Sequence, residues 1–195
     1  MNLIIIEGID QCGKSSLIRN ICKYYNYDNI VVRHFAKPPN GLSPKDALNF
    51  QMLTFFKETQ LLYWIKESDK DVYKYFETMV FYNRSYLGEY VYGQMFRGLD
   101  KDKLKKHILK FEKDNILKYE PKLIMLTANP SFCLEKEDGN SFSQTLEQKT
   151  IEIQLFDEIF EKSSIKDKLK IKVDDFGRFI PKEDVLKRAV KFLEQ

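Results

Sequence analysis

A short apolar run that leads straight into a glycine-rich turn is the feature that most constrains this chain. Residues 3–6 read LIII, and residues 8–15 read GIDQCGKS, which matches the pattern G-x-x-x-x-G-K-[ST] in full. A continuous apolar run is typical of a central parallel strand with both faces covered. Residues 15–25 then have helical spacing, so the turn lies between a strand and a helix, the context in which this pattern binds phosphate.

The pattern has a direct physical meaning. Glycines let backbone N–H groups point inward around a phosphate, and the amino end of the helix adds the positive end of its dipole. Lys14 would reach the β- and γ-phosphates of ATP or GTP, and the Ser15 hydroxyl would be the Mg²⁺ ligand. The expected nucleotide-binding residues are Gly8, Gln11, Cys12, Gly13, Lys14, Ser15 and Ser16. The alternative is a glycine-rich turn that only caps a helix and leaves Lys14 in solvent.

Apolar runs and helical patterns alternate along the rest of the chain. Strands are expected over 3–6, 30–32, 79–82, 123–126 and, as a lysine-protected edge strand, 168–173. Helices are expected over 15–25, 44–66, 85–96, 102–119, 142–160 and 181–193. This alternation predicts a three-layer α/β/α sandwich with a parallel five-stranded sheet. Ligands of such sheets bind beyond the carboxyl ends of the strands.

Length, charge and cysteine content limit the organisation of the protein and its partners. A chain of 195 residues with 43% hydrophobic content can form one core, so we expect a single domain over 1–195. The net charge of +3 gives little support for binding to nucleic acid or membrane. Because Cys12, Cys22 and Cys133 lack C-x-x-C spacing and no segment approaches a membrane span, we expect idle thiols in a soluble, cytoplasmic protein.

The phosphate loop alone does not define a reaction. The chain lacks the guanine-reading N-K-x-D of GTPases. Larger ATPases usually carry a carboxylate after a second apolar run, and here Asn83 takes that place in MVFYNR. Short chains with this loop and a long mobile segment near the carboxyl end are more often small-molecule kinases.

Three stretches resemble the thymidylate kinase-like family of nucleoside monophosphate kinases, close to its viral, phage-type versions. They are EGID with GKSS near the start, NRSYLGEYVYGQMFRG from residue 83 and SFSQTLEQKTIEIQLFDEIF from residue 141. The resemblance implies Mg·ATP-dependent transfer of the γ-phosphate to the 5′-phosphate of a deoxynucleotide under a mobile lid. We place this lid within 132–150; a viral protein would act in the host cytoplasm.

The resemblance also implies roles for individual residues. Asp10 matches the family acid that approaches the sugar 3′-hydroxyl; alternatively it is a turn residue that bonds its own backbone. Arg84 matches the family arginine that contacts phosphate near the transfer site, where a guanidinium can bind two oxygens and offset charge. The alternative for Arg84 is a structural salt bridge. Together with Lys14 and Lys149, these two residues are our candidate catalytic groups.

Two helical patterns suggest further contacts with the substrate. Tyr86, Tyr90 and Arg97 share one helix face, where aromatic edges and a cation could line a nucleotide site, although tyrosine stripes are as often core. On the long helix before the third strand, Phe56 could stack on a base while Gln60 reads its edge; plain packing is the alternative for both.

The late helix has an apolar stripe interrupted by one lysine. The stripe consists of Phe142, Leu146, Lys149, Ile153, Phe156 and Phe160. Since burying an unpaired ammonium group is costly, we expect the stripe to leave the core near Lys149. The lysine then points to phosphates as part of the lid, or it reaches solvent.

The sequence departs from the family pattern at three places. Asn83 stands where the family usually has an acid, which removes a charge near magnesium. Lys37 precedes Pro38 in HFAKPP, where a deoxynucleoside kinase would have a glutamate to take the 5′-hydroxyl proton. Lys37 therefore favours an acceptor that already carries phosphate. The lid contains lysines, such as Lys136 and Lys149, but no arginine.

The leading hypothesis is a Mg·ATP-dependent deoxynucleoside monophosphate kinase whose acceptor is dTMP or a modified pyrimidine monophosphate. A deoxynucleoside kinase and a nucleotide-binding regulatory protein with weakened catalysis are the alternatives. A kinase that acts on bases within DNA is less well supported because of the modest net charge. The expected partner is the nucleotide substrate, with no membrane; the sequence leaves open whether the protein is a homodimer.

Overall fold

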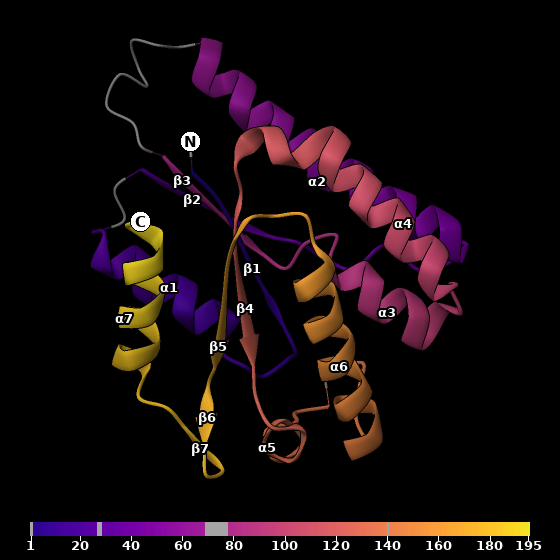
Figure 1. Cartoon of the computed structure of the whole chain (residues 1–195), viewed down its shortest axis with the longest axis vertical. Helices are drawn as coiled ribbons and strands as arrows, with labels where there is room; N and C mark the ends of the chain where they lie inside the picture. Colours follow the sequence, from indigo (N-terminus) through magenta and orange to yellow (C-terminus); the bar gives the residue numbers. More distant parts are fainter. Residues whose placement is uncertain (1, 27–28, 69–77, 140) are drawn as a thin grey trace.

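The computed structural model describes residues 2–26, 29–68, 78–139 and 141–195, and it contains a parallel sheet with helices against both faces (Figure 1). The sheet is formed by β1 (Asn2–Gly8), β2 (Ile30–His34), β3 (Met79–Asn83), β4 (Lys122–Thr127) and β5 (Asp167–Lys172). Its order is β2-β3-β1-β4-β5, and all neighbouring strands are parallel. The predicted α/β fold with five parallel strands is confirmed.

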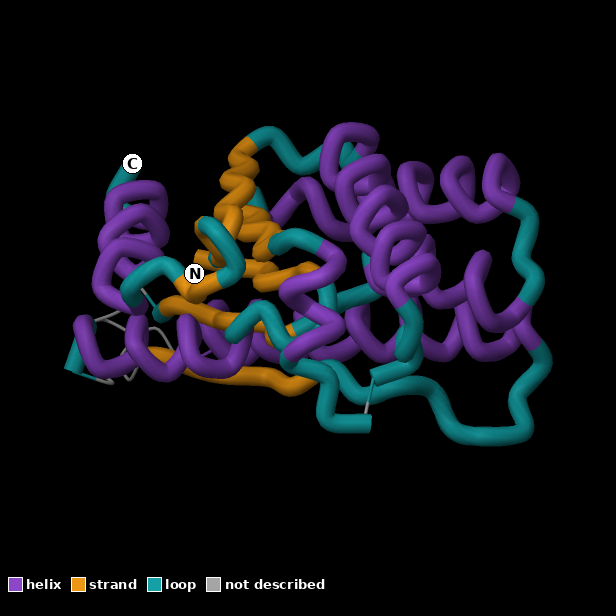
Figure 2. Tube along the Cα trace, turned by 90° about the horizontal axis from the view of Figure 1, so that it is seen from below, coloured by secondary structure: helices purple, strands orange, loops and turns teal. Residues whose placement is uncertain are grey.

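The helices form two layers around this sheet. They are α1 (Lys14–Tyr24), α2 (Pro44–Ser68), α3 (Gly88–Arg97), α4 (Lys101–Phe111), α5 (Pro130–Glu135), α6 (Leu146–Lys162) and α7 (Lys182–Leu193). A π-helical turn, η1 (Glu112–Ile116), and a 3₁₀ turn, η2 (Leu117–Tyr119), follow α4, and a small hairpin of β6 (Asp174–Asp175) and β7 (Arg178–Phe179) precedes α7. Figures 1 and 2 show α1 and α7 on one side of the sheet and α2, α3, α4 and α6 on the other.

The apolar run of β1 explains how the helices on both faces pack against the sheet. Side chains alternate between the two faces of a strand. Leu3 and Ile5 pack into the core under α2, α3 and α6, whereas Ile4 and Ile6 pack into the core under α1 and α7. All four side chains are buried. A polar residue at any of these positions would therefore face a core, which is why the run does not alternate.

Local hydrogen bonds move the starts of two predicted helices. Before α3 the chain forms a turn, in which the Ser85 hydroxyl accepts a hydrogen bond from the backbone N–H of Leu87 at 3.1 Å. α6 begins at Leu146 rather than at residue 142, because the Thr145 hydroxyl caps its amino end by accepting from the backbone N–H of Gln148. Both corrections shorten the helices at ends where polar side chains satisfy the backbone.

None of the helices in the described part of the chain combines the length and hydrophobicity that crossing a bilayer requires. The three cysteines are buried and free of disulfide bonds.

Candidate functional site

The loop between β1 and α1 has a backbone that only particular residues can adopt. Gly8 has a φ of 132°, and a Cβ at this position would collide with the backbone carbonyl of Leu126 on β4. Gln11 and Gly13 also have positive φ values, of 68° and 82°. Such a succession of unusual backbone conformations turns N–H groups toward one point, which is how a loop binds an anion.

Lys14 is the first residue of α1, and its side chain folds back over the loop. Its ammonium group donates hydrogen bonds to the carbonyl oxygens of Gly8, at 2.7 Å, and Ile9, at 2.8 Å. The carboxylate of Asp10 lies 3.7 Å from the same nitrogen. Burial, followed by the charge of Arg84, lowers the pKa of Lys14. The predicted phosphate-binding lysine is thus held over the loop by the loop's own carbonyl groups.

Three polar side chains meet where β2, β3 and α1 approach one another. The Asn83 amide donates to the Ser15 hydroxyl over 3.0 Å, and its nitrogen also lies 3.0 Å from Nδ1 of His34. Asn83 Oδ1 is buried and has no hydrogen-bond partner among the described residues. A hydroxyl and an orphaned amide oxygen are hard oxygen donors of the kind that Mg²⁺ takes alongside phosphates. The residues present therefore fit a magnesium ion, and Ser15 and Asn83 would hold it.

Asp10 and Arg84 form an ion pair across the sheet end. Arg84 follows β3 with a φ of 73°, and its backbone N–H donates to the carbonyl of Ile6 at 3.0 Å. A left-handed conformation is uncommon for a residue with a long side chain and is enriched at functional sites. It directs the guanidinium back over the loop toward Asp10. The structure brings together three of the four candidate catalytic residues, namely Lys14, Asp10 and Arg84.

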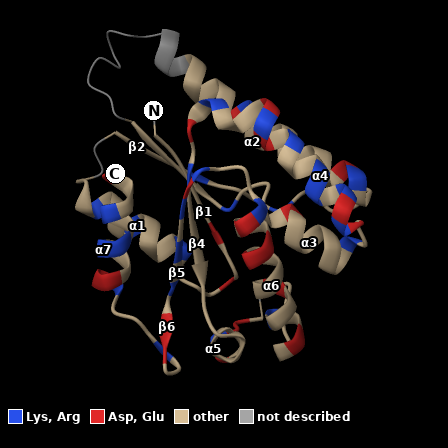
Figure 3. Cartoon of the chain, viewed as in Figure 1, with Lys and Arg blue, Asp and Glu red and all other residues tan. Residues whose placement is uncertain are grey.

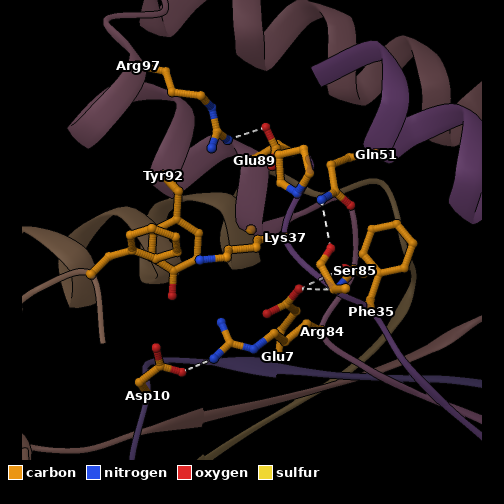
Figure 4. A pocket seen from close by; sticks show the side chains of 14 residues that line it. Glu7, Asp10, Phe35, Lys37, Gln51, Arg84, Ser85, Glu89, Tyr92 and Arg97 are labelled. Carbon is orange, nitrogen blue, oxygen red and sulfur yellow. Dashed lines mark hydrogen bonds and ion pairs between the residues drawn. The ribbon is translucent and has the colours of Figure 1, made fainter. Parts of the chain in front are cut away.

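A cavity of about 320 Å³, called the Arg84 cavity below, opens beside this ion pair. It is lined by Glu7, Asp10, Phe35, Ala36, Lys37, Pro38, Gln51, Arg84, Ser85, Gly88, Glu89, Tyr92, Arg97 and Phe142. Figure 4 shows Asp10 and Arg84 at one end and Glu89 and Arg97 at the other. Lys37 and Arg97, both predicted substrate contacts, lie in this lining; Lys37 is 5.8 Å from the centre of the Phe142 ring.

Each end of the Arg84 cavity has a buried carboxylate with a fixed partner. Glu7 accepts hydrogen bonds from the backbone N–H of Ser85, at 2.5 Å, and from its hydroxyl, at 2.9 Å. Glu89 is paired with Arg97. Burial raises the pKa of both carboxyl groups. Neither glutamate was among the predicted catalytic or substrate-binding residues.

Gln51 of α2 is the most informative residue that sequence reasoning missed. Its side chain is 3% exposed, and its amide nitrogen donates to the carbonyl of Ala36 at 2.8 Å. Its oxygen is buried without a partner among the described residues. The sequence feature that could have identified Gln51 is its position as a polar residue next to the apolar stripe of Leu48, Met52 and Phe55.

Tyr86 and Tyr90 do not line the Arg84 cavity. Both are fully buried, and the Tyr86 hydroxyl donates to Glu112 at 3.1 Å on the far side of α3. Their position agrees with the alternative given for them from the sequence, namely packing in the core. Tyr86 lies in the turn before α3. Arg97 lines the cavity, where its long side chain pairs with Glu89, whereas the tyrosines face the core.

Phe56 and Gln60 also lie outside the Arg84 cavity. Phe56 follows the fully buried Phe55, so its side chain leaves α2 in another direction, with Lys118 5.5 Å from its ring centre. Gln60 lines a separate hollow together with Trp64 and other residues of α2 and η2. Their contact with a base stays a prediction, and their positions agree with plain packing.

Lys149 lies at the edge of the core and does not reach solvent. It is fully buried, and its ammonium lies 2.5 Å from a carboxylate oxygen of Glu137. Ser141 donates to the same oxygen at 2.5 Å. Although burial raises the pKa of Glu137, Lys149 and Ser141 bring it down to about 2. The stripe leaves the core near Lys149, as predicted: Phe156 and Phe160 are buried, whereas Leu146 and Phe142 are 50% and 42% exposed. Lys149 itself is buried because its ammonium is paired.

A second cavity, of about 360 Å³, lies on the other side of the loop and is called the Gln11 cavity below. It is lined by Gln11, Cys12, Gly13, Ser16, Leu17, Asn20, Val173, Phe179, Ile180, Lys182 and Val185. Four of the predicted nucleotide-binding residues are in this lining. The segment of residues 10–13 thus separates two cavities, with Asp10 on one side and Gln11, Cys12 and Gly13 on the other.

Comparison with solved structures finds the same fold in other proteins. The thymidylate kinase from Ehrlichia chaffeensis aligns with a TM-score of 0.63 and 14% sequence identity, over 100% of this chain and 98% of that chain. The YorR protein from Bacillus subtilis, solved in complex with phosphorylated GDP, aligns with a TM-score of 0.57 and 18% identity, over 99% and 96%. At these identities the likeness shows the fold. No family model and no curated protein matches the sequence.

Proposed function

We propose that this protein is a Mg·ATP-dependent kinase that phosphorylates a deoxynucleoside monophosphate, dTMP or a modified pyrimidine monophosphate, to the diphosphate. The observation that supports this most is the pair of cavities that share one wall. Residues 10–13 contribute to both linings, and Lys14 lies directly after them. Two ligands bound on opposite sides of the loop would therefore meet at a buried lysine, as a transfer between two nucleotides requires.

The donor side consists of the loop and the Gln11 cavity. The triphosphate of ATP would lie along the backbone N–H groups of the loop, with the rest of the nucleotide toward Gln11 and Ser16. Lys14 would exchange the carbonyls of Gly8 and Ile9 for phosphate oxygens, since charged oxygens are better acceptors for an ammonium. Magnesium, when bound, would neutralise charge on the transferred phosphate. Ser15 and Asn83 would contribute its protein ligands.

The acceptor side is the Arg84 cavity. Arg84 and Lys37 would bind the acceptor phosphate, Asp10 the sugar 3′-hydroxyl, and Gln51 with Phe35 the base. An oxygen of the acceptor phosphate attacks the γ-phosphorus, the bond from that phosphorus to the β–γ bridging oxygen breaks, and ADP leaves. Because the attacking oxygen is already ionised, the step needs no general base, and Lys37 suits it better than a carboxylate.

The predicted lid corresponds to α5, the following loop and the start of α6. We propose that it closes over the transferred phosphate. Lys136 is exposed and is the lid cation with the freest reach. For Lys149 to act on phosphate, it must first leave Glu137, so its catalytic role requires that the Glu137–Lys149 pair opens on closure.

Glu7 supports one alternative acceptor. Its carboxylate lines the Arg84 cavity and has a pKa raised by burial, properties suited to taking a proton from a 5′-hydroxyl. A deoxynucleoside kinase would use it in this way.

The distribution of charge argues against nucleic acid as the acceptor. Figure 3 shows basic and acidic residues on the same helices, α2 and α4, rather than a continuous basic surface there. The homodimer remains a prediction that sedimentation would test.

One assay separates these functions. ADP release is measured with Mg·ATP against a panel of nucleosides, nucleoside monophosphates and a DNA duplex, with the Lys14→Ala variant as the background. The proposal expects turnover with pyrimidine deoxynucleoside monophosphates. Turnover with nucleosides only would indicate a deoxynucleoside kinase that uses Glu7 as the base. ATP binding without ADP release on any acceptor would indicate a regulatory nucleotide-binding protein.

A further inference from the structure

Two of the three cysteines lie against each other beneath the phosphate loop. The sulfur atoms of Cys12 and Cys133 are 3.9 Å apart, and one thiol donates a weak hydrogen bond to the other. Their positions in the sequence are 121 residues apart. Cys12 belongs to the loop itself, and Cys133 lies on α5, just after β4. The fold alone brings them together, because no C-x-x-C spacing connects them.

We propose that Cys12 and Cys133 form a peroxide-sensitive oxidation site, in which an intramolecular disulfide ties the phosphate loop to α5 and stops nucleotide binding. A disulfide needs the two sulfurs at about 2.05 Å. From 3.9 Å, rotation of two side chains together with a small movement of the loop can close this distance.

The surroundings favour reaction at Cys133. The hydrogen bond from Cys12 lowers the pKa of the Cys133 thiol, burial opposes this, and the nearby charge of Lys149 lowers it further. Conversely, the pKa of Cys12 is raised, first by this hydrogen bond and then by burial. One thiol of the pair is therefore the better nucleophile, and the other stays protonated at its side.

The chemistry balances with hydrogen peroxide as the oxidant. The Cys133 thiolate attacks one peroxide oxygen, the O–O bond breaks, and hydroxide leaves, which gives a sulfenic acid. Cys12 sulfur then attacks the Cys133 sulfur, the S–O bond breaks, and the thiol proton leaves with the oxygen as water. Two thiols lose two electrons in all, and one peroxide becomes two waters. A dithiol reverses the reaction by exchange.

A small oxidant has a path to this pair. Both side chains are buried, at 2% and 1% exposure, but Cys12 forms part of the wall of the Gln11 cavity. Peroxide is close to water in size and can enter a cavity of about 360 Å³. It would meet Cys12 first and reach the Cys133 sulfur, 3.9 Å from that of Cys12, when the Cys12 side chain rotates. Cys22 is also buried and packs in the apolar core beside α1, but it does not line the Gln11 cavity, and its thiol is not paired with either of the other two. It serves as the matched control.

The disulfide would act on the loop through geometry. Cys12 directly precedes Gly13, whose φ of 82° shapes the turn, and Lys14 follows. Displacing catalytic groups by about 1 Å can lower a rate on the order of a hundredfold. We therefore expect oxidation to reduce turnover at least roughly tenfold, an expectation that rests on the proposed kinase function, whereas formation of the disulfide does not.

The first test is chemical. The full-length protein is treated with hydrogen peroxide, its remaining thiols are alkylated at low pH, and peptides from a non-reducing digest are identified by mass spectrometry. We expect a peptide in which Cys12 is linked to Cys133, lighter by two hydrogens and split by dithiothreitol, with Cys22 alkylated. Free Cys12 and Cys133 thiols, a bond to Cys22, or a bond between two molecules would overturn the proposal.

The second test measures function before and after peroxide. Binding of a fluorescent ATP analogue and ADP release are followed for wild type, Cys22→Ser, Cys133→Ser and Cys133→Ala, with thermal melting as the check on folding. Wild type and Cys22→Ser should lose both signals reversibly, and the Cys133 variants should keep the values they had before oxidation. If protein that contains the Cys12–Cys133 disulfide binds the ATP analogue normally, the disulfide does not stop nucleotide binding and the proposal is overturned. This outcome can be read even if the protein phosphorylates none of the acceptors.

Discussion

The amide of Asn83, the last residue of β3, donates a hydrogen bond to the hydroxyl of Ser15, the second residue of α1, over 3.0 Å. This bond connects Asn83, which stands where the thymidylate kinase-like pattern has an acid, with the proposed magnesium ligand. An amide nitrogen donates to the hydroxyl oxygen, whereas a carboxylate would accept its proton and leave that oxygen free for a metal ion. In the proposed kinase, Asn83 would therefore affect magnesium binding both through its missing charge and through Ser15.

We predict that Asn83→Asp lowers the Mg²⁺ concentration needed for half-maximal rate roughly three- to tenfold, equivalent to about 1 kcal/mol from one added carboxylate near the metal. Titration of the rate against Mg²⁺ at fixed ATP, for the wild type and the variant, measures the shift. The double variant Asn83→Asp with Ser15→Ala should lose most of the gain, because the carboxylate acts partly through the hydroxyl.

A competing explanation assigns the charge near the metal to Glu7 or Asp10. A further carboxylate would then only raise the pKa of its neighbours by like-charge repulsion. An Asn83→Asp variant with unchanged or weaker Mg²⁺ affinity would support that explanation and refute ours.

Replacing Lys14 should separate catalysis from folding. Lys14→Ala removes the charge at the point where two phosphates would meet, and we expect turnover to fall by roughly a thousandfold or more. The two loop carbonyls that lose their donor should cost about 1–3 kcal/mol of unfolding free energy, measured by urea titration. Lys23→Ala, an exposed change on the same helix, should alter neither quantity. Near-normal turnover of a folded Lys14→Ala protein would remove the loop from the mechanism.

The sheet and the loop were predictable because their signals are local. Residues 3–6 are four apolar residues in succession, and they predict a buried strand. Gly8, where a Cβ would not fit, and Lys14, directly after Gly13, predict the phosphate loop that follows it. Each residue contributes to the fold through the strand or turn in which it lies. Residues directly after β1 and β3, such as Asp10 and Arg84, could be placed near each other because parallel strands end at the same edge.

The remainder of the site depends on distant contacts. Lys149 is buried within an apolar stripe because it pairs with Glu137, and only tertiary structure supplies this partner. Helical spacing placed Tyr86 beside Arg97 but could not show that the turn at Ser85 would direct the tyrosine into the core. Gln51 shows the same limit, because its significance lies in an oxygen left without a partner.

Gln51 should set the affinity for the acceptor. Gln51 lines the Arg84 cavity and carries a buried oxygen without a partner among the described residues. We expect Gln51→Ala to raise KM for the acceptor about tenfold, the effect of one hydrogen bond of roughly 1.4 kcal/mol. KM for ATP should not change, because the Gln11 cavity is on the other side of the loop. Steady-state kinetics with each substrate varied provides both values. Asn49→Ala, an exposed change on the same helix, is the control, and an equal effect of both variants would contradict the assignment.

The Glu137–Lys149 pair should make stability depend on pH in the acidic range. The pKa of Glu137 falls from an ordinary value of 4.5 to about 2 in the folded protein. A carboxyl group whose pKa is depressed by folding contributes stability that is fully present above its unfolded pKa and is lost as the pH falls through the folded value. Between pH 4.5 and about 2, the free energy of unfolding should therefore decrease in the wild type and decrease less in Glu137→Gln. Urea unfolding at several pH values measures both slopes, with Glu135→Gln, an exposed neighbour, as the control. If Glu137→Gln keeps the wild-type slope, the pair does not stabilise the lid segment before closure, and Lys149 is free to serve as the phosphate-binding lysine of the lid without breaking a strong contact.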